Sequence, residues 1–143
     1  MIFVRHGQTN GNVRGSFGGW TDLPLNETGR EQAEMAAEKL KDEKIDAIYA
    51  SPLSRALDTA KIINKYHGHE IIVKNELKER NFGKWEDQTF GFLKKNYPDE
   101  VEAWLSDWAN YEIEGGESTY QSYTRVINFM NDLTVFFLSI LDF

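Results

Sequence analysis

Cysteine is absent from this sequence. Its absence excludes disulfide bonds and metal sites built from thiolates. A chain without disulfides suits a reducing compartment, and the first expected strand begins at residue 2, which leaves no room for a signal peptide. We therefore expect a cytoplasmic protein.

Basic residues are few beside acidic ones, since 16 Lys and Arg against 23 Asp and Glu give a formal net charge of −7. Nucleic acids and anionic membranes need a basic protein face. The composition therefore argues against both as partners. It leaves open a small anionic ligand in a local basic pocket.

Long hydrophobic runs are also lacking. The apolar stretch VFFLSILDF, at residues 135–143, is far shorter than the ~20 residues that a membrane-spanning helix needs. It is typical either of a fourth strand or of the continuation of the last helix.

What the sequence does contain is an alternation of strand and helix patterns. Short apolar runs predict buried strands at residues 2–5, 45–50 and 70–75. A capping box of Thr28 and Glu31 predicts a helix over about 29–41, and Ser51 with Pro52 predicts the start of a second. This order indicates a parallel sheet with right-handed crossovers in a three-layer α/β/α sandwich.

The remainder of the chain has helical patterns. They predict a helical cap over about residues 86–116 beside the sheet, within a single domain of residues 1–143. The four tryptophans either frame an aromatic substrate or fill the core, and the core is the commoner place for them: Trp20, Trp85, Trp104 and Trp108.

Chemically capable side chains follow each expected strand. Arg5 and His6 come directly after the first strand, at the sheet edge where ligands bind in open α/β folds. Arg55 lies in the first turn of the second helix, so its guanidinium and the helix N-terminus can face one anion. Glu79 follows the third strand and could protonate a leaving oxygen, and Asn12 could donate to the same anion. Taken singly, each residue has a plainer role as a cap or a solvated surface group.

Four segments resemble the histidine phosphatase superfamily, also called phosphoglycerate-mutase-like, in their order and spacing. They are RHGQTNGN, DLPLNETGREQA, IYASPLSRALDTA and LKERNFGKWED. The resemblance covers residues 1–134 and implies the fold of that family. It implies that His6 takes the phosphoryl group as a phosphohistidine, that Glu79 is the acid, and that no metal or cofactor takes part. The phosphate-binding residues it implies are Arg5, Thr9, Asn12, Gly19 and Arg55.

Within that family, the segments FGKWED, YPDEVEAW and GGES are similar to the α-ribazole phosphatase branch of cobalamin synthesis. The resemblance therefore implies a small-molecule phosphomonoester as substrate. Broad-specificity phosphatases share these segments, and a phosphoglycerate mutase remains an alternative, although the mutases resemble one another in a longer insertion. Asp87 departs from the branch, which usually has glycine there.

The family completes its pocket with a second histidine, in a segment resembling VVSHGG. Simple register puts Ser139 and Ile140 where that segment has its serine and histidine. His67 and His69 lie in a turn at the amino end of the third strand, on the wrong side of the sheet and without a carboxylate cluster for a metal. We expect a domain that is incomplete at its C-terminus and impaired in turnover. The alternative is an inactive phosphate-binding module, and an open sheet edge beside the first strand would allow a homodimer.

Overall fold

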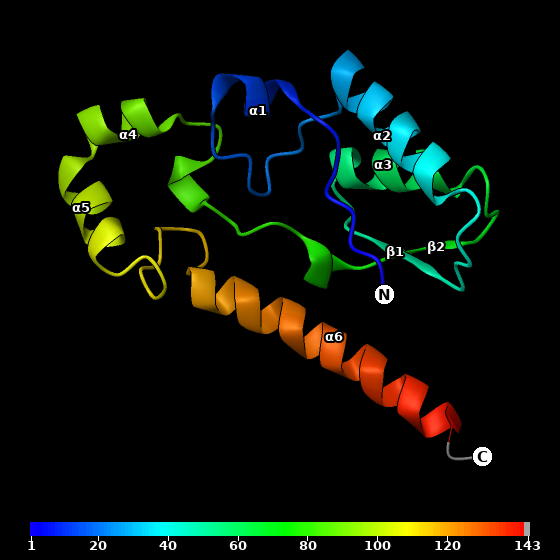
Figure 1. The fold of residues 1–143 in the computed structure, drawn as a ribbon. Coiled ribbons are helices and arrows are strands. Elements are labelled where there is room, and N and C mark those ends of the chain that lie inside the picture. The colour runs from blue at the N-terminus through cyan, green and yellow to red at the C-terminus, as the bar shows by residue number, and fades with distance from the viewer. Residues whose placement is uncertain (142–143) are drawn as a thin grey trace.

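The computed structural model describes the chain over residues 1–141 and its side chains over residues 1–133 (Figure 1). In chain order, its elements are the helices and strands α1 (Asn10–Arg14), α2 (Glu27–Leu40), β1 (Ile48–Ala50), α3 (Ser54–Asn64), β2 (Ile71–Val73), the short 3₁₀ helices η1 (Asn75–Leu77) and η2 (Gly83–Trp85), α4 (Phe90–Asn96), α5 (Pro98–Ser106) and α6 (Thr119–Leu141).

The two strands pair in parallel, with Ile48 opposite Ile71 and Ala50 opposite Val73. Helix α3 packs on the strands and α2 packs on α3. On the other side of the strands, the Phe129 ring of α6 meets the Tyr49 ring of β1 edge-on, with 5.8 Å between ring centroids. Helices thus cover both faces of a parallel sheet, which confirms the expected α/β/α class.

The predicted strand at residues 2–5 does not form. Residues 1–8 are neither helix nor strand. No backbone hydrogen bond joins residues 1–5 to the rest of the described chain, and the Phe3 side chain is 78% exposed instead of buried. The prediction is wrong here because an apolar run forms a strand only where a neighbouring strand lies within hydrogen-bonding distance. A groove of about 1090 Å³ lies here instead, between residues 1–6, β1 and α6.

Two helix starts also differ from the prediction. Helix α2 begins before the predicted capping box, because the Asn26 side chain accepts a hydrogen bond from the Gly29 N–H at 2.8 Å. Helix α3 begins at Ser54 with Leu53 as its N-cap residue and without a cap from its own side chain. Ser51 instead accepts from the Leu53 N–H at 3.3 Å, so it belongs to the turn before the helix.

Helices α4 and α5 pack over a hydrophobic cluster. Its buried members are Trp85, Leu93, Val101 and Ile113, and Trp104 packs against them. Trp85 and Trp104 are therefore core residues, whereas Trp20 and Trp108 are exposed.

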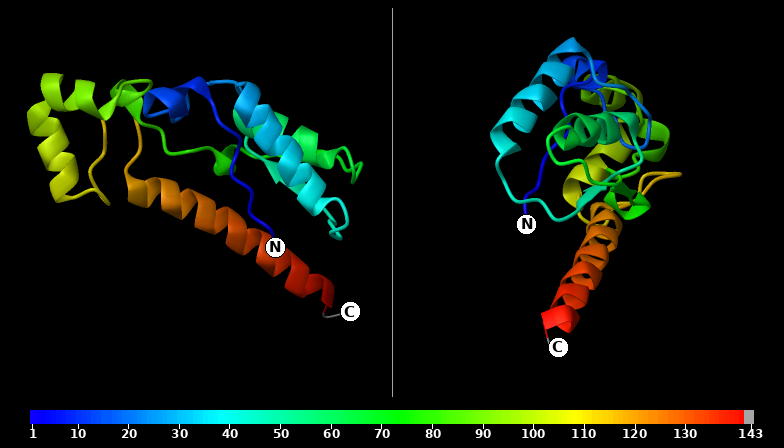
Figure 2. Two further views of the ribbon diagram at one scale, coloured as in Figure 1. Left: turned by 45° about the horizontal axis from the view of Figure 1, so that its top comes forward. Right: turned by 90° about the vertical axis from the view of Figure 1, so that its right-hand side faces the viewer.

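Helix α6 continues to Leu141, so residues 135–141 are helical and the fourth-strand alternative is wrong; residues 142–143 lie outside the described chain. Figure 2 shows α6 running along the molecule, with α4 and α5 beyond its first turns and α2 and α3 above its later ones. None of the helices in the described chain is both long enough and apolar enough to cross a membrane.

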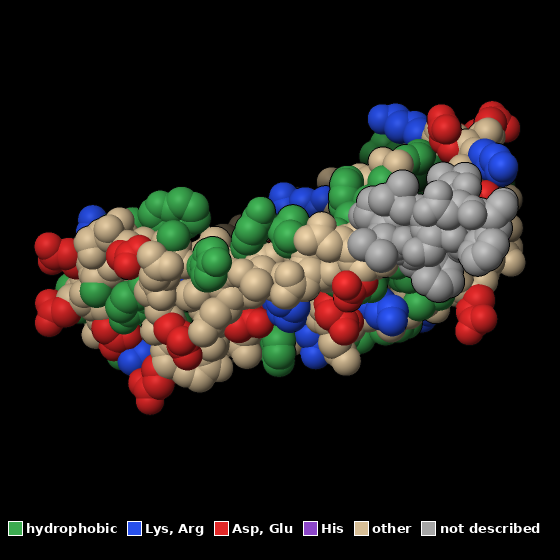
Figure 3. Space-filling model, turned by 90° about the horizontal axis from the view of Figure 1, so that it is seen from below, with side chains coloured by type: hydrophobic (Ala, Val, Ile, Leu, Met, Phe, Trp, Pro, Cys, Tyr) green, Lys and Arg blue, Asp and Glu red, His purple; other side chains and the backbone are tan. Residues whose placement is uncertain are grey.

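Charges on the α6 side of the molecule are mixed. In Figure 3, basic side chains are scattered among acidic ones over the coloured part of this face. They are not gathered there into the continuous basic surface that binding to a phosphate backbone requires.

Candidate active site

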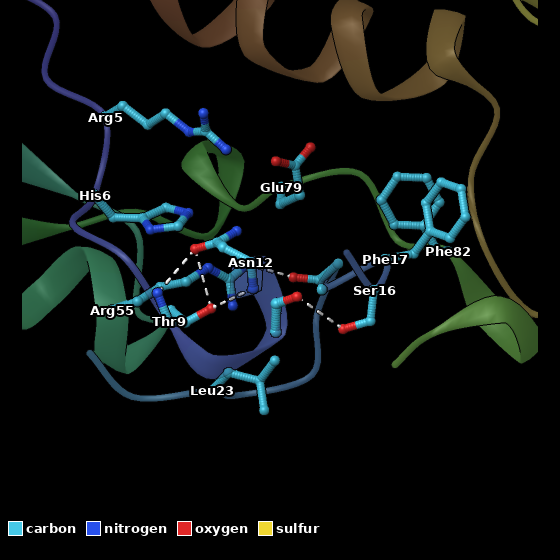
Figure 4. A pocket seen from close by; sticks show the side chains of 13 residues that line it. Arg5, His6, Thr9, Asn12, Ser16, Phe17, Leu23, Arg55, Glu79 and Phe82 are labelled. Carbon is cyan, nitrogen blue, oxygen red and sulfur yellow. Dashed lines mark hydrogen bonds between the residues drawn. The ribbon is translucent and has the colours of Figure 1, made fainter. Parts of the chain in front are cut away.

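A cavity of about 220 Å³ brings together all seven site residues that the sequence suggested (Figure 4). Its lining contains Arg5, His6, Thr9, Asn12, Gly19, Arg55 and Glu79, with further contributions from Gly11, Ser16, Phe17, Gly18, Leu23 and Phe82. In Figure 4, Arg5 and Glu79 lie on one side of the His6 ring and Asn12 and Arg55 on the other. The cavity therefore has positive charge on two sides of one imidazole.

His6 has a defined tautomer. Its Nδ1 lies 2.7 Å from the Gly7 carbonyl oxygen, and because a carbonyl only accepts, Nδ1 carries the proton. Burial lowers the pKa of His6 below its usual value; the Gly7 hydrogen bond and Glu79 oppose this effect, while the charges of Arg55 and Arg5 add to it. The ring is thus neutral at neutral pH, with a lone pair on Nε2 available as a nucleophile.

Arg55 is the most deeply buried cation of the cavity, at 4% exposure. Its Nη1 donates to the Thr21 carbonyl at 2.9 Å and its Nη2 to the Gly19 carbonyl at 2.6 Å. Burial lowers the pKa of Arg55, and the nearby carboxylates of Glu79, Asp22 and Glu86 oppose this shift. An arginine stays protonated under such conditions, so a full positive charge is held in place.

Asn12 and Thr9 hold each other through the capping box of α1. The Asn12 N–H donates to the Thr9 hydroxyl oxygen at 3.2 Å, and the Asn12 Oδ1 accepts from the Thr9 N–H at 2.9 Å and from its hydroxyl at 3.1 Å. Because Oδ1 is used in this way, the Nδ2 amide of Asn12 is the end that is left to donate to a ligand. In this geometry Thr9 orients Asn12, and Gly19 contributes its carbonyl to Arg55.

Thr59 was not among the expected residues, and it joins two parts of the site. Its hydroxyl accepts from the Gly7 N–H at 3.2 Å and donates to the Arg55 carbonyl at 2.7 Å, in a buried position. The signal was present, since Thr59 follows Arg55 by one helical turn on the same face of α3.

Glu79 lies on a segment that is fixed by α6. Arg125 of that helix donates to the backbone carbonyls of Glu76 and Lys78 at 2.8 and 3.0 Å, and to that of Glu79 at 3.3 Å. It also pairs with the Glu117 carboxylate through Nε and Nη2 at 3.0 and 2.8 Å. The backbone that carries Glu79 is thereby held by a residue that does not line the cavity, and the Glu79 carboxylate accepts from the Arg80 N–H at 2.9 Å.

Asp87 occupies a backbone conformation that favours glycine, with φ of 58°. Its carboxylate accepts from the Ser16 hydroxyl at 3.2 Å and pairs with Arg14. The departure from the glycine expected for the α-ribazole phosphatase branch thus adds a side-chain link beside the cavity wall.

The two remaining histidines lie away from the cavity. His69 Nε2 contacts the Ile45 carbonyl oxygen at 2.7 Å, and the His67 ring stacks near it. Among the residues described by the structure, no three potential ligands of the His, Asp or Glu type come together as a metal site.

Residues 1–135 match the family model described as "Histidine phosphatase superfamily (branch 1)". "Phosphoserine phosphatase 1" of Hydrogenobacter thermophilus is 32% identical over 133 residues, which are 93% of this chain and 63% of that protein. The alpha-ribazole phosphatase from Shigella flexneri superposes with a TM-score of 0.87 at 31% identity, covering 93% of this chain and 66% of the other. A mycobacterial glucosyl-3-phosphoglycerate phosphatase in complex with VO3 superposes with a TM-score of 0.82 at 34% identity, covering 92% and 65%. The chain spans between about half and two thirds of the length of the curated relatives it matches.

Proposed function

Since the chain belongs to the histidine phosphatase superfamily, we propose that its cavity binds the phosphoryl group of a small phosphomonoester and transfers it to His6. The observation that carries this proposal is the His6 ring, whose Nδ1 is bonded to the Gly7 carbonyl and whose Nε2 is left as the nucleophile beside Arg5 and the buried Arg55. Phosphoryl transfer needs an aligned nucleophile and fixed positive charge around the transferring oxygens. The cavity supplies both.

The proposed reaction has two displacements. His6 Nε2 attacks phosphorus, the bond to the leaving oxygen breaks, and the carboxylic acid of Glu79 protonates that oxygen. Water then attacks the phosphohistidine, and the Glu79 carboxylate takes the proton from this water. Inorganic phosphate is released, and neutral His6 and the carboxylic acid of Glu79 are regenerated. Arg5, Arg55 and Asn12 hold the phosphoryl oxygens throughout.

For the substrate, we propose α-ribazole 5′-phosphate as the first compound to test. A relative's name supports this choice, and so do two aromatic rings at the cavity wall, Phe17 and Phe82, whose centroids lie 4.8 Å apart. Such rings offer a stacking surface for an aromatic base. Phosphoserine and 3-phosphoglycerate derivatives are the competing substrates, and transfer to a second acceptor would instead indicate a mutase. The composition supports a cytoplasmic setting and a small-molecule partner rather than nucleic acid.

We further propose that the 143-residue chain turns over slowly. The sequence has three histidines. Within the described residues, His6 is the one histidine that lines the cavity. A missing preorganised donor at such a site typically costs about 10²–10³ in rate. The alternative, an inactive module that still binds phosphate, rests on the same arginines.

The test is steady-state hydrolysis of p-nitrophenyl phosphate together with orthovanadate binding. We expect weak turnover that His6→Ala abolishes and His67→Ala leaves unchanged. Arg55→Ala should weaken vanadate binding by about 1.5–3 kcal/mol, the range for charge-assisted hydrogen bonds.

Each contrary result has its own meaning. Vigorous turnover lost in His6→Ala would show that the proposed deficit is wrong. Vanadate binding without any turnover would favour the phosphate-binding module. Vanadate affinity unaffected by Arg55→Ala would contradict the site itself.

A further inference from the structure

The loop Gly18–Leu23 determines where the Arg55 guanidinium lies. Both hydrogen bonds that orient this group go to carbonyl oxygens of the loop, those of Gly19 and Thr21. Because Arg55 is buried, these bonds are shielded from water and fix the plane of the guanidinium. A shift of the loop would move the positive charge.

Glu86 in turn holds this loop. Its Oε1 accepts from the Trp20 N–H at 2.6 Å, and its Oε2 accepts from the Thr21 hydroxyl at 2.5 Å. Gly19 has φ of 47°, and a Cβ at this residue would collide with the Glu86 carboxylate. The glycine therefore lets one carboxylate approach the very residues that hold Arg55.

Glu86 lies next to the hydrophobic cluster that α4 and α5 cover. It follows Trp85, which is fully buried, and its Oε1 also accepts from the Phe82 N–H at 3.3 Å. Glu86 is not part of the described cavity lining. Its hydrogen bonds therefore act on a bound anion through the residues that they hold, first of all the loop that orients Arg55.

A second carboxylate joins the same loop to the start of α3. The Asp22 oxygens accept from the Ser54 N–H at 2.7 Å and from the Ser54 hydroxyl at 2.6 Å. Since α3 has no cap from its own N-cap side chain, Asp22 supplies one from the loop. Asp22 thus fixes the backbone just before Arg55, the next residue. The loop that Glu86 fixes holds the guanidinium of Arg55.

We propose that Glu86 is a positioning residue for Arg55, whose carboxylate keeps the loop Gly18–Leu23 in the geometry that presents the guanidinium to an anion. The proposal deepens the proposed function, and it rests on that function for the identity of the anion.

Orthovanadate binding to a series of Glu86 variants tests the proposal. Glu86→Ala should weaken binding by about tenfold, since two loop hydrogen bonds are lost. Glu86→Asp should weaken it similarly, because the shorter side chain does not reach both partners. Glu86→Gln should bind nearly as the parent does, because its amide oxygen still accepts from Trp20 and the Thr21 hydroxyl can accept from its N–H. Glu102→Ala, which removes an exposed carboxylate of α5, is the matched control.

The double variant Arg55→Ala/Glu86→Ala shows whether Glu86 acts through Arg55. We expect Glu86→Ala to have no further effect when Arg55 is already absent. An equal loss in both backgrounds would overturn the proposal, as would unchanged affinity in Glu86→Ala alone. Tighter binding in both Glu86→Ala and Glu86→Gln would indicate simple charge repulsion and would overturn it too. If Arg55→Ala itself has no effect, the anion site is wrong rather than the role of Glu86.

Thermal unfolding shows whether each variant is folded. If Glu86→Ala does not fold, Thr21→Val provides the measurement, because it removes one partner of Glu86 and keeps the carbonyl that holds Arg55. We then expect a smaller loss of vanadate affinity that is again absent in the Arg55→Ala background. Unchanged affinity in Thr21→Val would contradict the proposal.

Discussion

Three polar side chains of the cavity, those of His6, Asn12 and Arg55, are each oriented by another protein group. The Gly7 carbonyl sets the His6 tautomer, Thr9 orients Asn12, and loop carbonyls hold Arg55. Groups fixed in this way need little reorganisation when charge develops on a substrate, which is the main electrostatic source of catalysis.

The first prediction at this scale concerns the protonation of His6. Because the charge of Arg55 lowers the pKa of His6, Arg55→Ala should raise that pKa, and the acid limb of any turnover should move to higher pH with it. In the parent chain the neutral nucleophile should persist to pH values below the usual histidine pKa of about 6.5. An NMR titration of the His6 ring measures both, and a pKa that falls in Arg55→Ala would contradict this account.

Among the elements, α6 fixes the segment that carries Glu79, through Arg125 and its partner Glu117. Burial alone would raise the pKa of Glu117, but hydrogen bonds from Arg125 and the Asn81 N–H, with the charges of Arg125 and Arg80, hold it below its usual value. The ionised carboxylate therefore stabilises the fold.

The lowered pKa of Glu117 determines in which direction the stability of the fold changes with pH. A carboxyl whose pKa is lower in the folded chain contributes its full stability above the unfolded pKa, and the contribution is lost as the pH falls through the folded value. Glu117→Gln should thus reduce the free energy of unfolding at pH 7 by about 1–2 kcal/mol, which is the range for a charge-assisted hydrogen bond at a partly exposed site. Denaturant unfolding at several pH values checks this. The difference from the parent chain should shrink at acidic pH, and a difference that grows there would show the sign to be wrong.

Local patterns predicted α2 and α3 and located both strands, because caps and apolar spacing depend on a few neighbouring residues. Helix α1 was not predicted, and β1 and β2 are shorter than the predicted strands at 45–50 and 70–75. The patterns failed at residues 2–5, since strand formation depends on a partner strand that is often remote in sequence. The site residues could be found because they follow strand ends or open a helix, as Arg55 does. Glu86 and Arg125 could not, because their importance lies in hydrogen bonds to backbone groups far along the chain.

At the scale of the whole molecule, the groove between residues 1–6, β1 and α6 leaves apolar side chains exposed. Apolar side chains line much of it, and Met1 and Phe3 beside it are 80% and 78% exposed. Exposed apolar area beside an unpaired backbone edge favours association.

We expect the chain to form dimers in a concentration-dependent way through this groove. Phe3→Glu should weaken dimerisation, because it places a charge in the contact, whereas Met35→Glu, at another exposed apolar position on α2, should not. Light scattering over a range of protein concentrations measures the dissociation constant. A monomer at all concentrations, or equal effects of the two variants, would contradict this prediction.

The hydrogen bond between Gly7 and Thr59 also bears on how the chain folds. It joins residues 52 positions apart, and the bond from Arg55 to Gly19 joins residues 36 apart. Contacts of this range require large loops to close and are slow to form compared with local helical contacts. The anion site therefore exists only when these loops have closed. A bound oxyanion should consequently slow unfolding more than it accelerates folding, and so prolong the lifetime of the native chain.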